Sequence, residues 1–390
     1  RDSIREPMND FFRFQNKALI SATPIVPEKD SRFDGFMRVL IQPDYVYRQK
    51  LKLITTNNVL ETLQEVIEAK RGTVCIFCNS IDSIDSFYRL IPELSNACTF
   101  CSEDGQYKLW KGNRRKKSMM ITELERYNFF TSRFYSAVDI LCKNPPHVIF
   151  VSDLYGAAQS VIDPATEAIQ IIGRFRGGVN SVTHIASIRP ELECMSSSEI
   201  DHWIQGASTI FNGWKAQLAR TTNIGERTLL QEAIGENSYL PYLDENGKPD
   251  SFLIANFYEK EQVKRLYTSA DLLHLAYEQT GYFVFSHEER LMPVSDNERM
   301  AIQHRLAKKK RAELIVRKLE EMEKMSKATD KKIQKRYQRM LMNLITSTAD
   351  RYIYDCFCRF GAEFVREADY NENKLRTALN VSSEHTIKKS

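Results

Sequence analysis

Short apolar runs and amphipathic segments alternate along the first 190 residues of the chain. The apolar runs lack the polar alternation of half-buried strands, so they indicate strands that are buried on both faces. The segments between them carry apolar residues three and four positions apart, which predicts helices. Strands are expected at 17–20, 73–77, 97–100, 127–130, 147–151 and 181–188, and helices at about 58–70, 83–91 and 165–172. This order predicts an α/β fold, a parallel sheet with helices on both faces.

The pattern changes near residue 195, beyond which helical spacing dominates and an all-helical C-terminal region is expected. Helices are predicted at 199–218, 226–234, 252–267 and 269–279. Ser295-Asp-Asn-Glu298 has the spacing of a capping box and is expected to open a long helix toward Met325, followed by another from about Asp330 past Thr346. Four domains are expected. Residues 1–26 form a single strand with its loop, and residues 27–190 form an α/β domain. Residues 191–294 form a helical domain, and residues 295–390 form a region of long basic helices.

Composition places the chain among ordinary globular proteins. It has 390 residues, 42% hydrophobic and 27% charged, with a net charge of +4, so any preference for nucleic acid has to come from local patches. No apolar run approaches the ~18 residues of a membrane span, and the opening RDSIREPMNDFF does not resemble a signal peptide. We expect a fragment or processed piece, in the cytoplasm, the nucleoid or a viral replication site, neither secreted nor bound to a membrane.

Four of the eight cysteines have a spacing near that of a zinc ribbon. Cys75 and Cys78 form one C-x2-C pair, and Cys98 and Cys101 form another after nineteen intervening residues. Both pairs overlap predicted strands, where residues three apart point to opposite faces and cannot converge on one metal. We therefore interpret all four as core residues and expect no metal site.

Small polar or charged side chains follow several of the predicted strands. In a parallel sheet these positions share the carboxyl edge, where such sheets bind their ligands. Hydroxyl and amide groups there can hold a sugar-phosphate chain, and an arginine fork can neutralise a phosphoryl group. The residues concerned are Ser21, Thr23, Ser80, Thr131 and Asp139, with Gln170, Gly173, Arg174 and Arg176 at the end of the predicted helix 165–172.

The order and spacing of these segments resemble the C-terminal half of superfamily 2 helicases and translocases. Segment 21–23, Ser-Ala-Thr, matches motif III, which closes the first RecA-like domain of that family. Segments 74–80, 131–139 and 170–174 match motifs IV, V and VI of the second RecA-like domain. Four motifs in the family's order make a strong signal, and the resemblance covers about residues 15–190.

The resemblance also implies roles for individual residues and two ligands, ATP and Mg²⁺. It implies that Arg174, Arg176 and Gln170 are catalytic and that Asp139 and Gly173 bind the cofactor. It also implies that Ser80 and Thr131 bind nucleic acid and that Ser21 and Thr23 couple the two RecA-like domains. Motif V has Ala137 where the family usually has glycine, and the second arginine of motif VI follows the first by two residues instead of three. The arginine finger, the arginine that neutralises the transferred phosphoryl group, is therefore assigned jointly to Arg174 and Arg176.

The phosphate-binding sequence G-x-x-x-x-G-K-[ST] and an Asp-Glu box are both missing from the chain. In this family both precede motif III, so we expect a partner N-terminal RecA-like domain to supply them and expect no ATP hydrolysis by this chain alone. A simpler interpretation stays open, in which Gly173 ends a helix, the arginines are solvated, and Ser80, Thr131 and Asp139 are ordinary loop residues.

Two basic stretches are candidate nucleic-acid surfaces. Segment 107–117 carries six cations without an acid, among them Lys108, Arg114 and Arg115. Segment 305–339 carries fourteen Lys and Arg against five acids, a net charge of +9 that includes Lys309 and Arg311. Both stretches are equally explained as solvated faces.

We therefore expect the C-terminal part of an ATP-dependent helicase or translocase acting on DNA or RNA. Two alternatives remain: a nucleic-acid-binding module on a RecA-like scaffold, and the motor portion of a larger nuclease or replication-initiation protein whose helical region docks other proteins.

Overall fold

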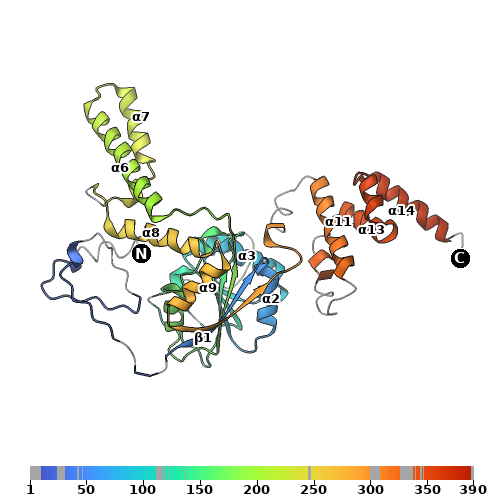
Figure 1. Ribbon diagram of the computed structural model, residues 1–390, viewed down its shortest axis with the longest axis horizontal. Coiled ribbons are helices and arrows are strands. Elements are labelled where there is room, and N and C mark those ends of the chain that lie inside the picture. Colours follow the sequence, from blue (N-terminus) through green and yellow to red (C-terminus); the bar gives the residue numbers. More distant parts are fainter. Residues whose placement is uncertain are drawn as a thin grey trace.

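A single eight-stranded sheet forms the centre of the described chain, and every pair of neighbouring strands is parallel (Figure 1). The computed structural model describes residues 10–23, 31–41, 44–45, 47–110, 117–118, 120–121, 123–136, 138–244, 247–298, 308–325, 337–338, 340–342, 345 and 347–387. The strand order is β4-β3-β5-β2-β6-β7-β1-β8. The predicted α/β fold with a largely helical C-terminal region is confirmed.

The strands are short where they are buried on both faces. Their bounds are β1 Gln49–Thr56, β2 Val74–Phe77, β3 Cys98–Phe100, β4 Lys117–Ser118, β5 Tyr127–Phe130, β6 His147–Ser152, β7 Ser181–Ser187 and β8 Phe283–Arg290. The helices of the α/β body are α2 Val59–Glu68, α3 Ile81–Leu90, α4 Glu103–Trp110, α5 Glu167–Gly173, α8 Ser251–Leu266 and α9 Ala270–Gln279.

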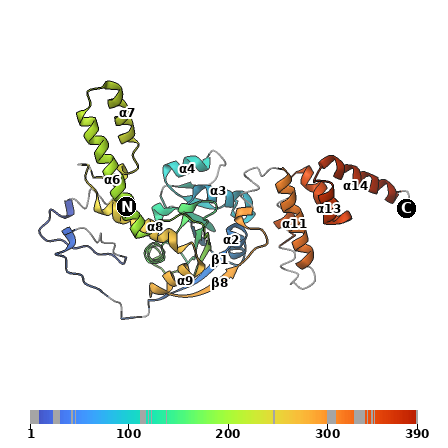
Figure 2. The same ribbon diagram turned by 45° about the horizontal axis from the view of Figure 1, so that its top comes forward.

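Two apolar layers cover the sheet, one on each face (Figure 2). Side chains of α2, α3 and α4 pack on one face in a cluster that includes Ile76 and Phe129. Side chains of α5, α8 and α9 pack on the other face in a cluster that includes Phe77 and Phe130. Because consecutive strand residues such as Ile76 and Phe77 supply opposite layers, the strands show the unbroken apolar runs seen in the sequence.

Three strands were not predicted: β1, β8 and the two-residue β4. β1 lies between β7 and β8, and β8 pairs with β1 in parallel, with Leu53 opposite His287. The prediction of a purely helical domain over 191–294 is therefore wrong at β8, which returns the chain to the sheet. α8 and α9 belong to the same body, since Val263 and Tyr277 lie in its core.

Residues 17–20 do not form the predicted strand. They have no regular secondary structure, and the side chain of Ile20 is 96% exposed. An apolar run becomes a strand only when a neighbouring strand accepts its backbone hydrogen bonds, and no described strand lies beside this one.

A helical arm projects from the body (Figure 1). It consists of α6, Ser197–Arg220, and α7, Ile224–Gly235. Phe211, Tyr239 and Leu243 form a small apolar cluster of their own near its base. No helix in the described part of the chain is long and apolar enough to cross a membrane.

A separate C-terminal lobe contains α11, Lys308–Met325, α13, Thr348–Glu367, and α14, Glu372–Ile387. The Ser295–Glu298 capping box is confirmed, with Glu298 N donating to Ser295 Oγ at 3.1 Å and Ser295 N to Glu298 Oε2 at 2.9 Å. The predicted helix past residue 346 is wrong, because Ile345 is not helical and Ser347 caps a new helix, α13.

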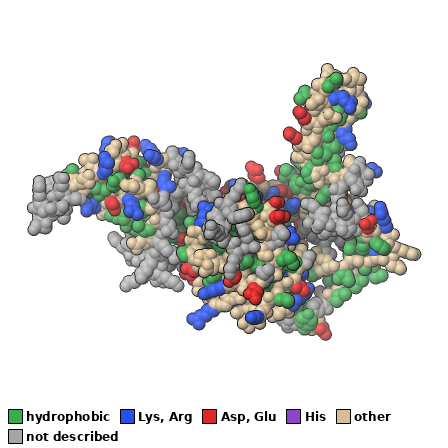
Figure 3. All heavy atoms as spheres, turned by 180° about the vertical axis from the view of Figure 1, so that it is seen from behind, with side chains coloured by type: hydrophobic (Ala, Val, Ile, Leu, Met, Phe, Trp, Pro, Cys, Tyr) green, Lys and Arg blue, Asp and Glu red, His purple; other side chains and the backbone are tan. Residues whose placement is uncertain are grey.

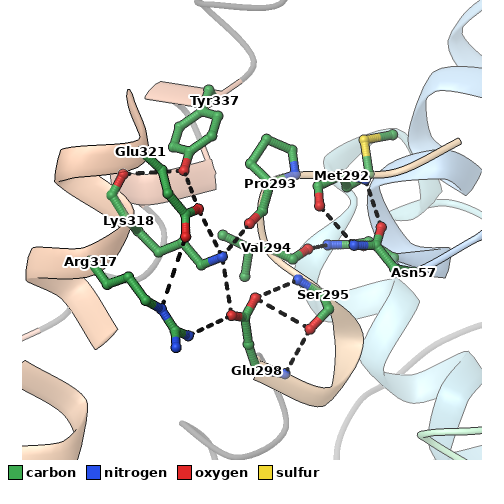
Figure 4. Close-up of polar contacts among 11 residues, drawn as sticks. Asn57, Met292, Pro293, Val294, Ser295, Glu298, Arg317, Lys318, Glu321 and Tyr337 are labelled. Atoms are coloured by element: carbon green, nitrogen blue, oxygen red, sulfur yellow. Dashed lines mark hydrogen bonds and ion pairs between the residues drawn. The ribbon is translucent and has the colours of Figure 1, made fainter. Parts of the chain in front are cut away.

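The segment 291–298 joins the lobe to the body, and the loop after β1 holds it (Figure 4). The amide of Asn57 exchanges two hydrogen bonds with the backbone of Met292, at 2.6 and 2.8 Å. Asn58 Nδ2 donates to the carbonyl of Val294 at 2.6 Å. The fully buried Asp296 accepts from Val59 N at 2.6 Å, at the first turn of α2.

The same segment is held from the other side by α11 (Figure 4). The ammonium group of Lys318, a side chain that is 8% exposed, donates to the carbonyl of Pro293 at 2.7 Å. It also forms ion pairs with Glu298 and Glu321, both at 3.1 Å. Three acceptors compensate the burial of this one cation, so the joint between lobe and body is specific.

Candidate functional site

The carboxyl ends of β2 and β5 meet through a contact between two of the predicted motif segments. Ser132 N, which follows β5, donates to the side-chain oxygen of Asn79, which follows β2, at 3.4 Å. Asn79 Nδ2 in turn donates to the carbonyl of Gln159 at 3.5 Å. Asn79 lies in the predicted segment 74–80, directly after a buried strand, but the sequence pattern assigned it no role of its own.

Arg174 connects the segment after β5 to α5. Its Nε donates to the carbonyl of Gln170 at 3.0 Å, and one terminal nitrogen donates to the carbonyl of Val138 at 3.4 Å. Ile140 N donates back to the carbonyl of Arg174 at 2.9 Å. The guanidinium group of Arg174 is therefore held in place by backbone oxygens on both segments.

Arg176 lies two residues further on and is more exposed. Its Nε pairs with Asp139 Oδ1 at 3.0 Å, with side chains that are 63% and 49% exposed. Exposed pairs of this kind stabilise a protein by at most about 1 kcal/mol, so a phosphoryl group can replace the carboxylate as partner.

Gln170 connects Arg174 to the N-terminal segment through hydrogen bonds of its side-chain amide. Its Nε2 donates to Thr23 Oγ1 at 2.9 Å, and its Oε1 accepts from Arg174 at 3.4 Å. Thr23 N donates to Ser21 Oγ at 3.0 Å, which closes a local turn. The four predicted segments thus form one connected set.

Gly173 has a smaller role than the sequence suggested. It is exposed at the end of α5, and an added Cβ there would have nothing within 4 Å. The structure thus gives no steric reason for glycine at this position.

Two predicted nucleic-acid contacts are buried. Ser80 is 4% exposed, and its hydroxyl accepts from Ser83 N at 3.1 Å as the N-cap of α3. Thr131 is 8% exposed, and its hydroxyl donates to the carbonyl of Phe100 at 3.5 Å. Local structure already uses both hydroxyls, and their contact with nucleic acid stays a prediction.

The first basic stretch is only partly described. Lys108 is exposed on the last turn of α4, and Tyr107 beside it is 59% exposed. Arg114 and Arg115 lie outside the described residues. The predicted contact of Lys108 with nucleic acid stays a prediction, made by an exposed cation on α4.

The second basic stretch includes a structural arginine. Arg311 makes a two-point ion pair with Asp350, Nε to Oδ1 at 3.0 Å and a terminal nitrogen to Oδ2 at 2.9 Å. Burial alone would raise the pKa of Asp350, but the hydrogen bonds from Arg311 and Ser347 hold it below its ordinary value. Arg311 thus has a structural role in the lobe, and its predicted contact with nucleic acid stays a prediction. Lys309 pairs with Asp369 at 2.8 Å on the surface.

The cysteine pairs divide between the two apolar layers. Cys75 and Cys98 lie in the layer with α5, and Cys78 and Cys101 lie in the layer with α2. The sequence argument that each pair points to opposite faces is confirmed. Burial, reinforced by the nearby Asp153, raises the pKa of the Cys78 thiol, which favours its protonated form over the thiolate that binds metals. Among the described residues, no group of three or more His, Cys, Asp or Glu side chains could hold a metal ion.

Asp153, at the end of β6, was missed although it follows a strand directly. It is 2% exposed, and its carboxylate accepts from Ser83 Oγ at 2.9 Å and from Gly156 N at 3.1 Å. A Cβ on Gly156 would lie 2.2 Å from the carboxylate, so only glycine allows this close approach. Asp153 thereby fixes the loop between β6 and α5.

No protein-family model matches the chain, and no curated protein matches it.

Proposed function

We propose that the chain is the C-terminal portion of an ATP-dependent nucleic-acid helicase or translocase and supplies motifs III to VI. The observation that carries the proposal is the connected set of hydrogen bonds through Asn79, Ser132, Arg174, Gln170 and Thr23. Residues that follow parallel strands share one edge of the sheet in any such fold, so the support comes from the side-chain contacts between the segments and not from their proximity alone.

Arg176 is our candidate for the arginine finger. Its exposed side chain can exchange Asp139 for a phosphoryl group, whereas backbone carbonyls hold Arg174 in place. Arg174 then positions the finger, and Gln170 with Thr23 couples it to the N-terminal segment. Fingers of this type lower the barrier to phosphoryl transfer by neutralising charge that develops in the transition state.

ATP and Mg²⁺ fit this proposal only in part. The arginines suit the γ-phosphoryl group, but a phosphate-binding lysine and the carboxylates that hold Mg²⁺ would have to come from a partner RecA-like domain. DNA or RNA would pass along the carboxyl edge of the sheet, where Ser132 and Arg133 are exposed.

One observation favours a second candidate, a nucleic-acid-binding module without ATP turnover. The Arg176 side chain already has a carboxylate partner in Asp139, as it would in a scaffold that never meets a phosphate. The two candidates differ in whether any form of the protein hydrolyses ATP.

ATPase assays test the proposal. Residues 1–390 should show no turnover above background, with or without nucleic acid. A longer protein, in which the proposed N-terminal RecA-like domain is joined to residues 1–390, should hydrolyse ATP, and DNA or RNA should stimulate it. Turnover by residues 1–390 alone would contradict the split site, and an inactive extended protein would favour the binding module.

A further inference from the structure

The C-terminal lobe contains two helices joined by a tight turn. α13 ends at Glu367 and α14 begins at Glu372, so residues 368–371 form the whole connection. Asp369 and Tyr370 have φ angles of 53° and 56°. Two consecutive non-glycine residues with positive φ are uncommon and cost backbone energy, so the surrounding structure has to stabilise this turn.

Hydrogen bonds and packing hold the turn. Tyr370 N donates to the carbonyl of Val365 at 3.2 Å, and the Tyr370 ring packs on the apolar cluster of the lobe. The side-chain oxygen of Asn371 accepts from Asn373 N at 3.1 Å and from Lys374 N at 3.2 Å, which caps α14. α13 is kinked at Gly361, which has a φ of 84°, so its segment 362–367 is the part that leads directly into the turn. Two packed helices joined by a three- or four-residue turn form a helix–turn–helix.

The two faces of α14 differ in chemistry. Leu375, which is fully buried, and the partly buried Leu379 pack on the apolar cluster of the lobe. The opposite face, at the helical spacing of three, four and seven, is exposed and consists of Asn373, Arg376, Thr377 and Asn380. These four positions contain no acid, and the next position at the same helical spacing is Glu384. The four side chains are of the types that read base edges, arginine pairing with guanine and asparagine with adenine.

Lysines lie beside the turn 368–371. The ion pair between Lys309 and Asp369, at 2.8 Å, places the start of α11 against the turn. Lys308 and Lys310 are exposed on either side of Lys309 in the sequence. Lys and Arg side chains are visible along the rim of the lobe in Figure 3. Contacts from such cations to phosphates position a protein on a duplex, while a helix face reads the groove.

We propose that α14, the turn 368–371 and Lys308–Lys310 form a binding site for double-stranded DNA, with the outer face of α14 in the major groove. An α-helix about 10–12 Å across fits a major groove about 12 Å wide. The major groove of double-stranded RNA is too narrow and deep to be read this way, which selects DNA. This site is distinct from the motif segments and goes beyond the proposed motor function.

Fluorescence anisotropy with a labelled, mixed-sequence DNA duplex of ~30 base pairs, three helical turns, tests the site in residues 1–390 without nucleotide. The variant Asn373→Ala/Arg376→Ala/Asn380→Ala should bind the duplex about tenfold more weakly or worse, since each base contact contributes ~1–3 kcal/mol. Asn212→Ala/Arg227→Ala, exposed residues of the same types on the arm, should leave binding unchanged. Circular dichroism checks folding, and Arg376→Glu replaces the triple variant if that variant unfolds.

The salt dependence separates the two kinds of contact. Lys308→Gln/Lys310→Gln should make the slope of log K against log salt shallower by about two units, because each phosphate that is no longer neutralised changes the slope by ~0.9. Three results would overturn the proposal: no duplex binding by the parent chain, binding by the face variant within twofold of the parent, or equal displacement by single-stranded DNA or double-stranded RNA. None of these results depends on ATPase activity, so failure of the motor proposal and failure of this one are distinguishable.

Discussion

The side-chain amide of Gln170 donates a 2.9 Å hydrogen bond to the hydroxyl of Thr23, although 147 positions separate the two residues in the chain. Gln170 lies on α5, and Thr23 lies in a turn of the N-terminal segment that Ser21 closes. The contact holds an otherwise irregular, exposed segment against the α/β body. The oxygen of the same Gln170 amide accepts a hydrogen bond from the guanidinium group of Arg174.

Gln170→Ala should therefore release the N-terminal segment. A partly buried hydrogen bond contributes about 1 kcal/mol, so local opening should become about fivefold more frequent. Hydrogen exchange of a peptide covering residues 17–23 measures this. Gln64→Ala, which removes an exposed bond to Glu68 on α2, should leave that peptide unchanged. Equal exchange in Gln170→Ala and the parent would contradict a holding role.

The two arginines should separate by their effects on turnover and on stability. In the ATP-hydrolysing protein, Arg176→Ala should lower kcat by ~10³-fold with an unchanged melting temperature, because its only described partner is the exposed Asp139. Arg174→Ala should also lower the melting temperature, because it removes donors to the carbonyls of Gln170 and Val138. Steady-state kinetics and thermal unfolding of both variants decide the assignment. A larger kcat loss in Arg174→Ala would reverse it.

The sequence predicted the strands that are buried on both faces but not β1 or β8. β2 and β5 are fully buried and read as unbroken apolar runs. β1 begins Gln-Lys-Leu-Lys, with exposed lysines at positions 50 and 52. β8 is the edge strand, and its second half, Ser-His-Glu-Glu-Arg, faces partly toward water. β8 becomes a strand by pairing with β1, more than 200 residues away in the chain, and β1 pairs with both β7 and β8.

The sequence predicted which polar residues follow the buried strands but not the partners of their side chains. A hydroxyl directly after a strand is equally suited to cap the next helix, and Ser80 does so. Arg311 looked like one cation among fourteen, because its partner Asp350 is 39 positions away and on another helix. Long-range pairing of this kind depends on helix packing, which local spacing does not report.

Arg311→Gln should destabilise the C-terminal lobe. The side chains of Arg311 and Asp350 are 20% and 5% exposed, and removing one member of a buried pair leaves the other charge uncompensated. The free energy of unfolding of the lobe should fall by about 3 kcal/mol, measured by chemical denaturation. The neighbouring Lys310→Gln, an exposed position, should change it by less than about 0.5 kcal/mol. Equal effects of the two substitutions would show that the pair has no structural role.

His184 connects β7 to the elements that cover it. Its Nδ1 lies 2.8 Å from the hydroxyl of Tyr277 on α9, and its Nε2 lies 3.0 Å from Ser152 Oγ on β6. Ser152 donates its own proton to the hydroxyl of Tyr267. A neutral imidazole protonated at Nε2 therefore satisfies both contacts, whereas an imidazolium would leave a second proton facing the donor Tyr277.

Acid should destabilise the α/β body through this residue. Burial lowers the pKa of His184 from 6.5 to about 3 in the folded chain, so below pH 6.5 the unfolded chain takes up a proton that the folded chain does not. This contribution to stability is complete above pH 6.5 and is lost at about 1.4 kcal/mol per pH unit as the pH falls toward 3. Chemical denaturation at pH 7 and pH 5 should show a loss of about 2 kcal/mol in the parent that is missing in His184→Gln. His202→Gln, at an exposed position on α6, should behave as the parent does. If His184→Gln loses as much stability between the two pH values as the parent, then other groups govern the acid response and the neutral buried imidazole does not.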